Sequence, residues 1–180
     1  MRQLVLHPTS TAQWHSLVCE AEDLAKVYLD EELQSYLVFL LMRFLSKPEI
    51  TTKVLAMDYI ESLLSTGRHQ QDRLRDVGDV CLIHAGFFPK RAKRKRVSEH
   101  YFVELGSGAY QHLSAVVDHQ VATLYYRLYE SFIPLRDLLR TMRDLDRKPE
   151  SRPSVANVAI ADAVENQTTL RMPTSPRVKH

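Results

Sequence analysis

The feature of this chain that most constrains its fold is the helical spacing of its apolar residues. In one segment after another these residues recur at intervals of three and four positions, the pattern of helices that bury one face. Signals for β-strands are nearly absent, since residues 3–6 form a single candidate strand and one strand cannot make a sheet. The pattern therefore predicts an all-α fold.

The apolar stripes predict six helical segments, which begin near Thr11, Asp30, Ile50, His69, Ser98 and Val121. Ser10 and Gln13 fit a capping box at the start of the first segment, and the Asp30 side chain can cap the second. Gly67 is placed to end the third segment. Pro134 removes a backbone hydrogen bond inside the last segment, which predicts a kink or two abutting helices there. We therefore expect a bundle of six or seven helices.

The length and composition fit one helical domain followed by a tail. The 180 residues are 44% hydrophobic and 26% charged, a balance typical of globular chains and unlike that of disordered ones. After residue 148 prolines become frequent and aromatic residues stop. We expect a single helical domain over residues 1–148 and a flexible, largely irregular, proline-containing tail over residues 149–180. Residues 155–164 carry a thin apolar stripe, so a short docked helix there is the alternative.

The cysteine count and the apolar runs bear on the compartment. The chain has two cysteines, Cys19 and Cys81, too few for a disulfide framework, which favours a reducing compartment. The first residues lack the apolar run of a secretory signal. The most apolar run, residues 36–45, contains Arg43 and would span about half a bilayer as a helix. We expect a cytoplasmic protein without a transmembrane segment.

The sequence lacks the motifs of several common catalytic sites. It contains no GxxxxGK[ST] phosphate loop, no GxGxxG dinucleotide fingerprint, no HExxH zinc motif and no GxSxG nucleophile elbow. No histidine has a glutamate three residues before it, which disfavours a ferritin-like di-iron site. We therefore expect no catalytic residue, no cofactor and no metal. The missing motifs favour a protein that is not an enzyme but leave enzymatic activity open.

Two pairs of residues have the spacing of metal ligands on one helix face. Cys81 and His84 are three residues apart, and a thiolate with an imidazole can bind zinc or haem iron. His112 and His119 are seven residues apart and also share a face. Free cysteines and single histidines are more often core residues than ligands, so core packing is the favoured interpretation of both pairs.

Asp79 stands in the apolar end of the fourth segment, where an unpaired carboxylate would be costly. An Arg or Lys from the following loop, or a hydroxyl from Tyr101 or Tyr110, would be a suitable partner. The favoured interpretation is a buried anchor. The alternative is a small-molecule, haem or metal pocket, with or without enzymatic activity, and its candidate residues are Asp79, Cys81, His84, Tyr101, Glu104 and Tyr110.

The strongest surface feature is a basic run, with six Lys and Arg among the seven residues 90–96. The rest of the chain has 18 basic and 22 acidic residues, so the positive charge is concentrated here. Such a run is either solvated, paired within the molecule or neutralised by an anionic partner. The two preceding phenylalanines either join that surface or, as we favour, plug the core at the helix end. The candidate partner- or anion-binding residues are Phe87, Phe88, Lys90, Arg91, Lys93, Arg94, Lys95 and Arg96.

Short motifs lie on both sides of the basic run: Gly78-Asp79-Val80, Ala85-Gly86-Phe87-Phe88, Val97-Ser98, Tyr101-Phe102, Gly106 and Ala109-Tyr110. This set resembles a signature of an uncharacterised family of small bacterial helical proteins. The resemblance covers residues 78–110 and implies a bacterial cytoplasmic protein whose distinctive features meet where the fourth and fifth helices flank the basic run. Gly78 and Gly106 would suit close approach of those two helices.

The concentrated charge and the missing catalytic motifs favour a non-enzymatic binding or adaptor protein whose basic loop holds an anionic partner. An acidic protein is the favoured partner, and nucleic acid or an anionic lipid is the alternative. The surplus of apolar surface on the second helical segment leaves a homodimer open.

Changing Arg91, Arg94 and Arg96 to Glu should abolish capture of the partner, because it reverses half of the charge that attracts an anion. Capture is measured by affinity purification from the native host under gentle salt, followed by mass spectrometry. Unchanged capture by a variant that keeps its helical circular-dichroism signal would contradict the loop hypothesis.

Overall fold

The computed structural model describes residues 9–46, 55–88 and 98–146, and these residues form seven α-helices and no strand. In chain order the helices are α1 (Ser10–Ala25), α2 (Glu31–Ser46), α3 (Leu55–Leu64), α4 (Gly67–Phe87), α6 (Glu99–Val116), α7 (His119–Glu130) and α8 (Phe132–Asp146). The all-α fold class is therefore confirmed. The predicted tail, residues 149–180, lies outside the described part of the chain. No helix in the described ranges is both long and apolar enough to cross a membrane.

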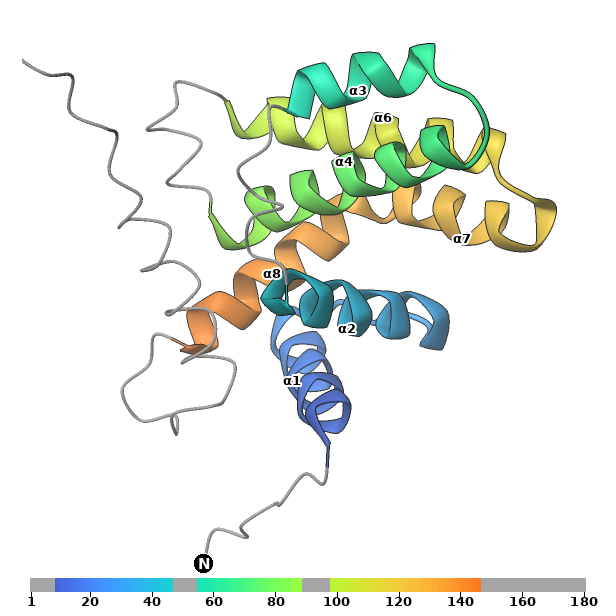
Figure 1. The fold of residues 1–180 in the computed structure, drawn as a ribbon. Coiled ribbons are helices and arrows are strands. Elements are labelled where there is room, and N and C mark those ends of the chain that lie inside the picture. Colours follow the sequence, from blue (N-terminus) through green and yellow to red (C-terminus); the bar gives the residue numbers. More distant parts are fainter. Residues whose placement is uncertain (1–8, 47–54, 89–97, 147–180) are drawn as a thin grey trace, which may run out of the picture.

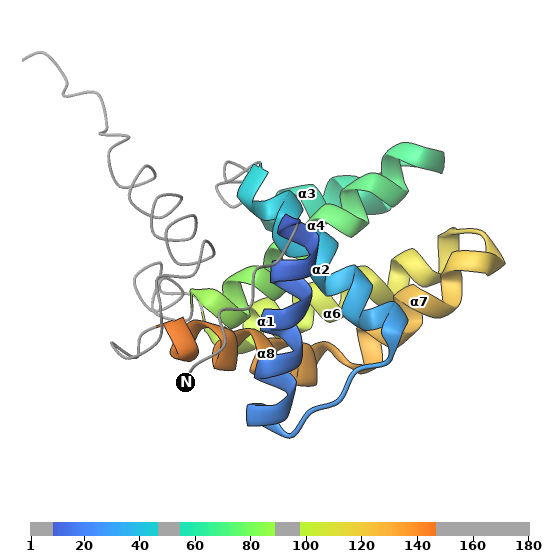
Figure 2. The same ribbon diagram turned by 90° about the horizontal axis from the view of Figure 1, so that it is seen from below.

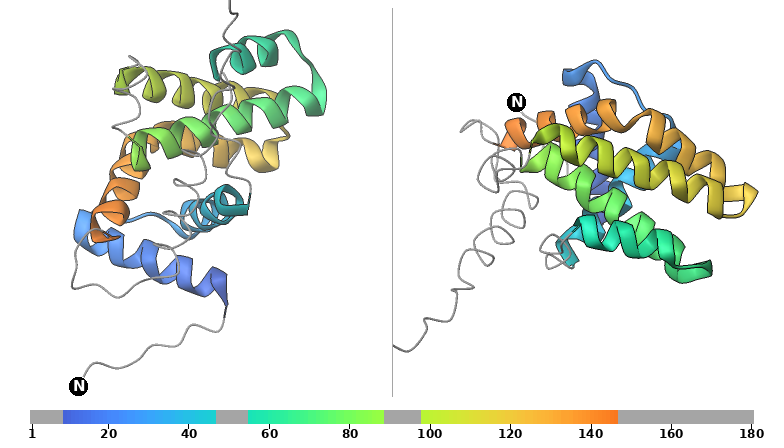
Figure 3. Two further views of the ribbon diagram at one scale, coloured as in Figure 1. Left: turned by 60° about the vertical axis from the view of Figure 1, so that its left-hand side comes forward. Right: turned by 90° about the horizontal axis from the view of Figure 1, so that it is seen from above.

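Helix α4 is the centre of the fold. Figure 1 shows α3, α4, α6 and α7 side by side, each running opposite to the one before it. The most extensive packing is between α4 and α6, while α8 packs on both α4 and α1. Figure 1 and the left view of Figure 3 show α1 and α2 on the opposite side of α4 from α3. Figure 2, seen from below, shows α1 crossing α8, on which it packs.

This central position explains the burial of α4. Its first three turns are partly exposed, whereas residues 77–87 are all buried. The helix thus loses its polar face where other helices surround it, and the polar groups in that stretch must find partners inside the protein.

Glycines allow three of the close helix contacts. A Cβ atom at Gly78 would lie 2.5 Å from the Tyr110 ring of α6, and one at Gly106 would lie 2.6 Å from Cys81 Cβ of α4. The predicted close approach of these two helices is therefore confirmed. The third contact is with α8, where a Cβ at Gly86 would lie 2.5 Å from Leu139 Cβ.

The helix boundaries follow the local signals, with one shift. The cap of α1 is Thr9, whose side chain accepts a hydrogen bond from the Ala12 amide, so the predicted capping box at Ser10 is one residue late. Asp30 caps α2 as predicted, since its Oδ1 accepts from two amides of the first turn. Ser98 caps α6 in the same way.

The turns around α3 and before α8 also follow from single residues. Gly67 has a left-handed φ of 66°, as a chain reversal requires, but it opens α4 instead of directly following α3, which ends at Leu64. Pro134 separates α7 from α8 as two abutting helices, one of the two predicted outcomes. Pro134 occupies the first turn of α8. Backbone N–H groups there have no partner within the helix, so the N–H that proline lacks costs no hydrogen bond.

Two glycines in α6 provide a matched test of this packing. Gly106→Ala should lower the free energy of unfolding by about 1–2 kcal/mol, because the new methyl group meets the Phe132 ring and Cys81. Gly108→Ala should raise it by about 0.5–1 kcal/mol, because its Cβ meets nothing closer than the Tyr59 hydroxyl at 3.5 Å and alanine favours helix. Urea unfolding followed by circular dichroism measures both, and equal effects of the two substitutions would contradict the packing.

Candidate functional site

The middle of α4 holds a buried carboxylate that receives hydrogen bonds from two other helices. The Tyr36 hydroxyl of α2 donates to Asp79 Oδ1 at 2.6 Å, and the Tyr110 hydroxyl of α6 donates to the same oxygen at 2.8 Å. Arg43 Nη1 of α2 donates to Oδ2 at 2.8 Å, and the other end of this guanidinium pairs with Asp76. We call Asp79, Tyr36, Tyr110 and Arg43 the Asp79 cluster.

The electrostatics of the Asp79 cluster suit a structural anchor. Burial raises the pKa of Asp79 from its ordinary value of 3.8 to about 6, while the two tyrosine hydroxyls and Arg43 oppose the rise. The carboxyl group is therefore mainly ionised at neutral pH. Burial and the charge of Asp79 raise the pKa of Tyr36 and Tyr110 well above the ordinary value, so both hydroxyls keep their protons. This arrangement supports the interpretation of Asp79 as a buried anchor, here between α2, α4 and α6.

The partners of Asp79 agree only partly with the sequence-based expectation. Tyr110 is one of the two hydroxyls expected, and Tyr101 is not a partner. Arg43 of α2 supplies a cation, and the loop after α4, from which an Arg or Lys was expected, lies outside the described residues. The sequence did contain a signal for it, because Arg43 is the one charged residue in the most apolar run of the chain. Nothing in the sequence indicated Tyr36, which lies 43 positions from its partner.

The remaining buried residues of the predicted pocket do not join the Asp79 cluster. Cys81 is fully buried, and this burial raises the pKa of its thiol far above the ordinary value, which leaves the thiol protonated and inert. The His84 ring stacks on the Phe102 ring, with 5.1 Å between the ring centroids. Burial and the neighbouring Cys81 raise the pKa of Tyr101. These residues form an apolar contact between α4 and α6.

The polar surface residues singled out in the sequence lie apart from that contact. Glu104 is exposed, with its Oε1 2.9 Å from Nε2 of His100. The Nδ1 atom of His112 lies 2.6 Å from the Tyr59 hydroxyl of α3, and His119 is exposed at the start of α7. Within the described ranges, no three or more His, Cys, Asp or Glu side chains are grouped so that they could hold a metal ion.

The basic run, residues 90–96, lies outside the described residues, so the structure gives no information on it. The phenylalanines before it are described. Phe87 is buried in the core, and the half-buried Phe88 ring contacts the rings of Phe44 and His84. These contacts agree with the favoured expectation that both phenylalanines plug the core.

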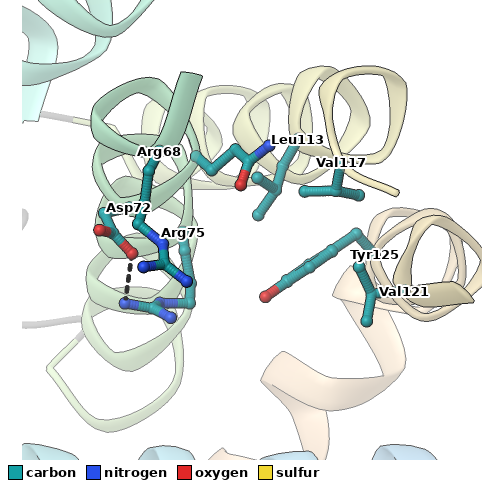
Figure 4. Close-up of a pocket in the computed structure, with 8 residues that line it drawn as sticks. Arg68, Asp72, Arg75, Leu113, Val117, Val121 and Tyr125 are labelled. Atoms are coloured by element: carbon teal, nitrogen blue, oxygen red, sulfur yellow. Dashed lines mark hydrogen bonds and ion pairs between the residues drawn. The ribbon is translucent and has the colours of Figure 1, made fainter. Parts of the chain in front are cut away.

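A separate cleft of about 450 Å³ opens beside the first half of α4. We call it the α4–α7 cleft, and the residues that line it are Arg68, Gln71, Asp72, Arg75, Leu113, Val117, Val121 and Tyr125. Figure 4 shows that its two sides differ: charged side chains of α4 form one side, and apolar side chains around the junction of α6 and α7 form the other. The Tyr125 hydroxyl points into the space between them.

Two guanidinium groups face this cleft. Arg75 Nη2 donates to Asp72 Oδ1 at 3.1 Å, whereas Arg75 Nε is buried and has no hydrogen-bond partner among the described residues. Burial raises the pKa of Tyr125, and the positive charge of Arg75 opposes that rise. The positive charge of Arg75 also lowers the pKa of Asp79, against the rise caused by burial. Arg75 therefore acts both on the cleft and on the Asp79 cluster. Arg68 forms no ion pair with another residue in the described ranges.

The cleft and the Asp79 cluster share a wall. The Tyr125 ring makes an edge contact with Tyr36, with 6.2 Å between centroids, and stacks on Tyr110 at 6.4 Å. At the cleft edge, Gln71 Nε2 donates to the Val116 carbonyl at 2.8 Å, which ties α4 to the end of α6. Two tyrosines of the Asp79 cluster therefore hold Tyr125, the aromatic residue of the cleft lining, in place.

No residue of the α4–α7 cleft was among the site residues predicted from the sequence. The available signal was the spacing of Arg68, Asp72 and Arg75, which places three charged groups on one face of a helix. Residues 113–125 form the opposite side of the cleft. No pattern in the sequence of α4 indicates that these residues lie across from it.

Comparison of the chain with models of known protein families, with curated proteins and with solved structures finds no match. The resemblance of residues 78–110 to a bacterial family thus remains a prediction.

The raised pKa of Asp79 predicts a pH dependence of stability. Between about pH 4 and 6 the folded protein binds more protons at this group than the unfolded chain, so the free energy of unfolding falls as pH rises through that window. At about 1.4 kcal/mol per pKa unit, wild type should lose about 2–3 kcal/mol relative to Asp79→Asn between pH 3.5 and 7. Urea unfolding across this range measures it. The exposed Asp144→Asn is the control, and identical profiles for Asp79→Asn and wild type would contradict the assignment.

Proposed function

We propose that the protein is a non-enzymatic binding protein that holds a small organic anion in the α4–α7 cleft. The ligand would place its charged group beside Arg68 and Arg75 and its apolar part against the opposite side of the cleft. This keeps the function class expected from the sequence, a protein that binds an anionic partner, and adds a second place where that binding would occur.

The observation that carries the proposal is the pairing of guanidinium groups with an apolar wall across one cleft. Arginine is suited to this task because its planar fork of donors matches a carboxylate or a phosphate. The Arg75 side chain is 38% exposed and lines the cleft, so a ligand there can approach it, although its Nε atom is buried.

The size and the lining of the cleft also support a small ligand. Its volume of about 450 Å³ is within the range of ordinary small-molecule sites, roughly 300–1,000 Å³. The exposed lining is more polar than apolar, which suits a ligand that carries a charge. A nucleic acid would instead require a longer track of positive charge, and Asp72 on the same side of the cleft interrupts one.

The basic run remains the alternative binding element. It would hold an acidic protein, a nucleic acid or an anionic lipid independently of the cleft, and the Arg91, Arg94 and Arg96 variant tests it separately.

The fluorescent dye anilinonaphthalene sulfonate, an aromatic monoanion, serves as the probe of the cleft. Arg75→Gln and Arg68→Gln should each weaken dye binding about tenfold, because each removes a charged hydrogen-bond donor worth roughly 1.5 kcal/mol or more. The measurement is a fluorescence titration at low salt.

The chain offers a matched control on the same helix. Arg73 of α4 does not line the cleft and pairs with Glu61 of α3, so Arg73→Gln should leave the affinity unchanged. The dye can also bind exposed apolar residues of α3, of which Leu64 is 83% exposed, and Leu64→Gln measures that contribution. If Arg75→Gln, Arg68→Gln and Arg73→Gln all bind the dye as tightly as wild type does, the proposal is wrong.

A further inference from the structure

The charged side of the α4–α7 cleft carries a negative group between its two positive ones. Asp72 lies four residues after Arg68 and three before Arg75, so all three side chains share one face of α4 (Figure 4). The Asp72 side chain is 54% exposed, and its Oδ1 accepts from Arg75 Nη2. The lining residues of the cleft thus have one net positive charge.

We infer that the cleft takes organic anions with an apolar group, and that Asp72 is the residue that limits how strongly the cleft favours a doubly charged ligand, such as a phosphate monoester, over a singly charged one, such as an aromatic carboxylate. The inference rests on the proposed function, because it concerns the ligand class of the same cleft.

Two features of Arg75 carry this inference. Its guanidinium already neutralises Asp72, with which it shares a hydrogen bond. It also faces the inner carboxylate of Asp79, whose raised pKa it opposes. A ligand beside Arg75 therefore meets a cation whose charge is partly offset from two sides. One negative charge on the ligand balances the net charge of the lining, and each further negative charge is repelled by Asp72 while the two arginines attract it.

The apolar side of the cleft determines which uncharged group the ligand carries beside its anionic group. Leu113, Val117 and Val121 offer aliphatic surface, and Tyr125 offers an aromatic face with a hydroxyl directed into the space. Planar aromatic rings stack well on such a face. An aromatic or branched apolar group joined to a carboxylate fits this combination.

The size of the effect of Asp72 follows from Coulomb's law. At a separation of about 6 Å and an effective dielectric constant of about 60, the repulsion by Asp72 alone weakens binding roughly fivefold for each unit of negative charge on the ligand. Removing the charge of Asp72 should help a dianion twice as much in free energy as a monoanion. The ratio of the two affinities is therefore the quantity to measure.

The experiment compares two ligands with the same ring system, 2-naphthoate and 2-naphthyl phosphate, by isothermal titration calorimetry at pH 8. At this pH the phosphate monoester is doubly charged, since its second pKa is about 6. In Asp72→Asn the ratio should shift about fivefold towards the phosphate.

Two further variants separate charge from structure. Asp72→Glu keeps the charge and should keep the wild-type ratio. Asp144→Asn removes an exposed aspartate that pairs with Arg143 on α8, outside the cleft lining, and should also leave the ratio unchanged.

The contradicting outcomes are distinct for the two proposals. If both ligands bind through Arg75 but the ratio is the same in wild type and Asp72→Asn, the selectivity inference is wrong and the proposed function stands. If neither ligand binds wild type and the dye titration is equally insensitive to Arg68 and Arg75, the proposed function and the inference fail together.

Discussion

The structure depends on the burial of one carboxylate, that of Asp79, in the middle of its central helix. An ionised carboxylate in such a place is tolerated only when donors surround it. Here a guanidinium and two hydroxyls do so, from α2 and α6. Because these donors reach Asp79 from different directions, they fix how both helices lie against α4. Removing one donor would leave charge unpaired in the core, which costs more than the pairing contributes.

The same cluster sets one side of the α4–α7 cleft. Tyr125 packs its ring on Tyr36 and Tyr110 and directs its hydroxyl into the cleft, so the aromatic surface offered to a ligand has a rigid support. Arg75 donates a hydrogen bond to the exposed Asp72, and its positive charge also acts on the buried carboxylate of Asp79. The cleft and the Asp79 cluster thus share a packing contact through Tyr125 and a charge interaction through Arg75. For this reason the shape of the cleft and its net charge both depend on the cluster.

Local signals predicted the helices well, and long-range pairing explains what they missed. Periodicity and caps at Asp30 and Ser98 act within one helical turn, so the sequence reveals them directly. Gly78 and Gly106 were also informative, because glycine inside a buried helix indicates close packing. The partners Tyr36 and Arg43 and the wall opposite Arg75 come from segments tens of residues away. An apolar stripe shows that a face is buried but not which helix covers it. The cleft was missed for this reason, whereas the need of Asp79 for partners was foreseen.

The most direct test of this account is a nitrogen–proton NMR titration that follows the arginine side-chain Nε–H signals while 2-naphthoate is added. The account predicts that the Arg75 and Arg68 signals move in a saturable manner, while the Arg73 signal on the same helix stays in place. A saturating response at Arg73, or at no arginine of α4, would show that the α4–α7 cleft is not an anion-binding site.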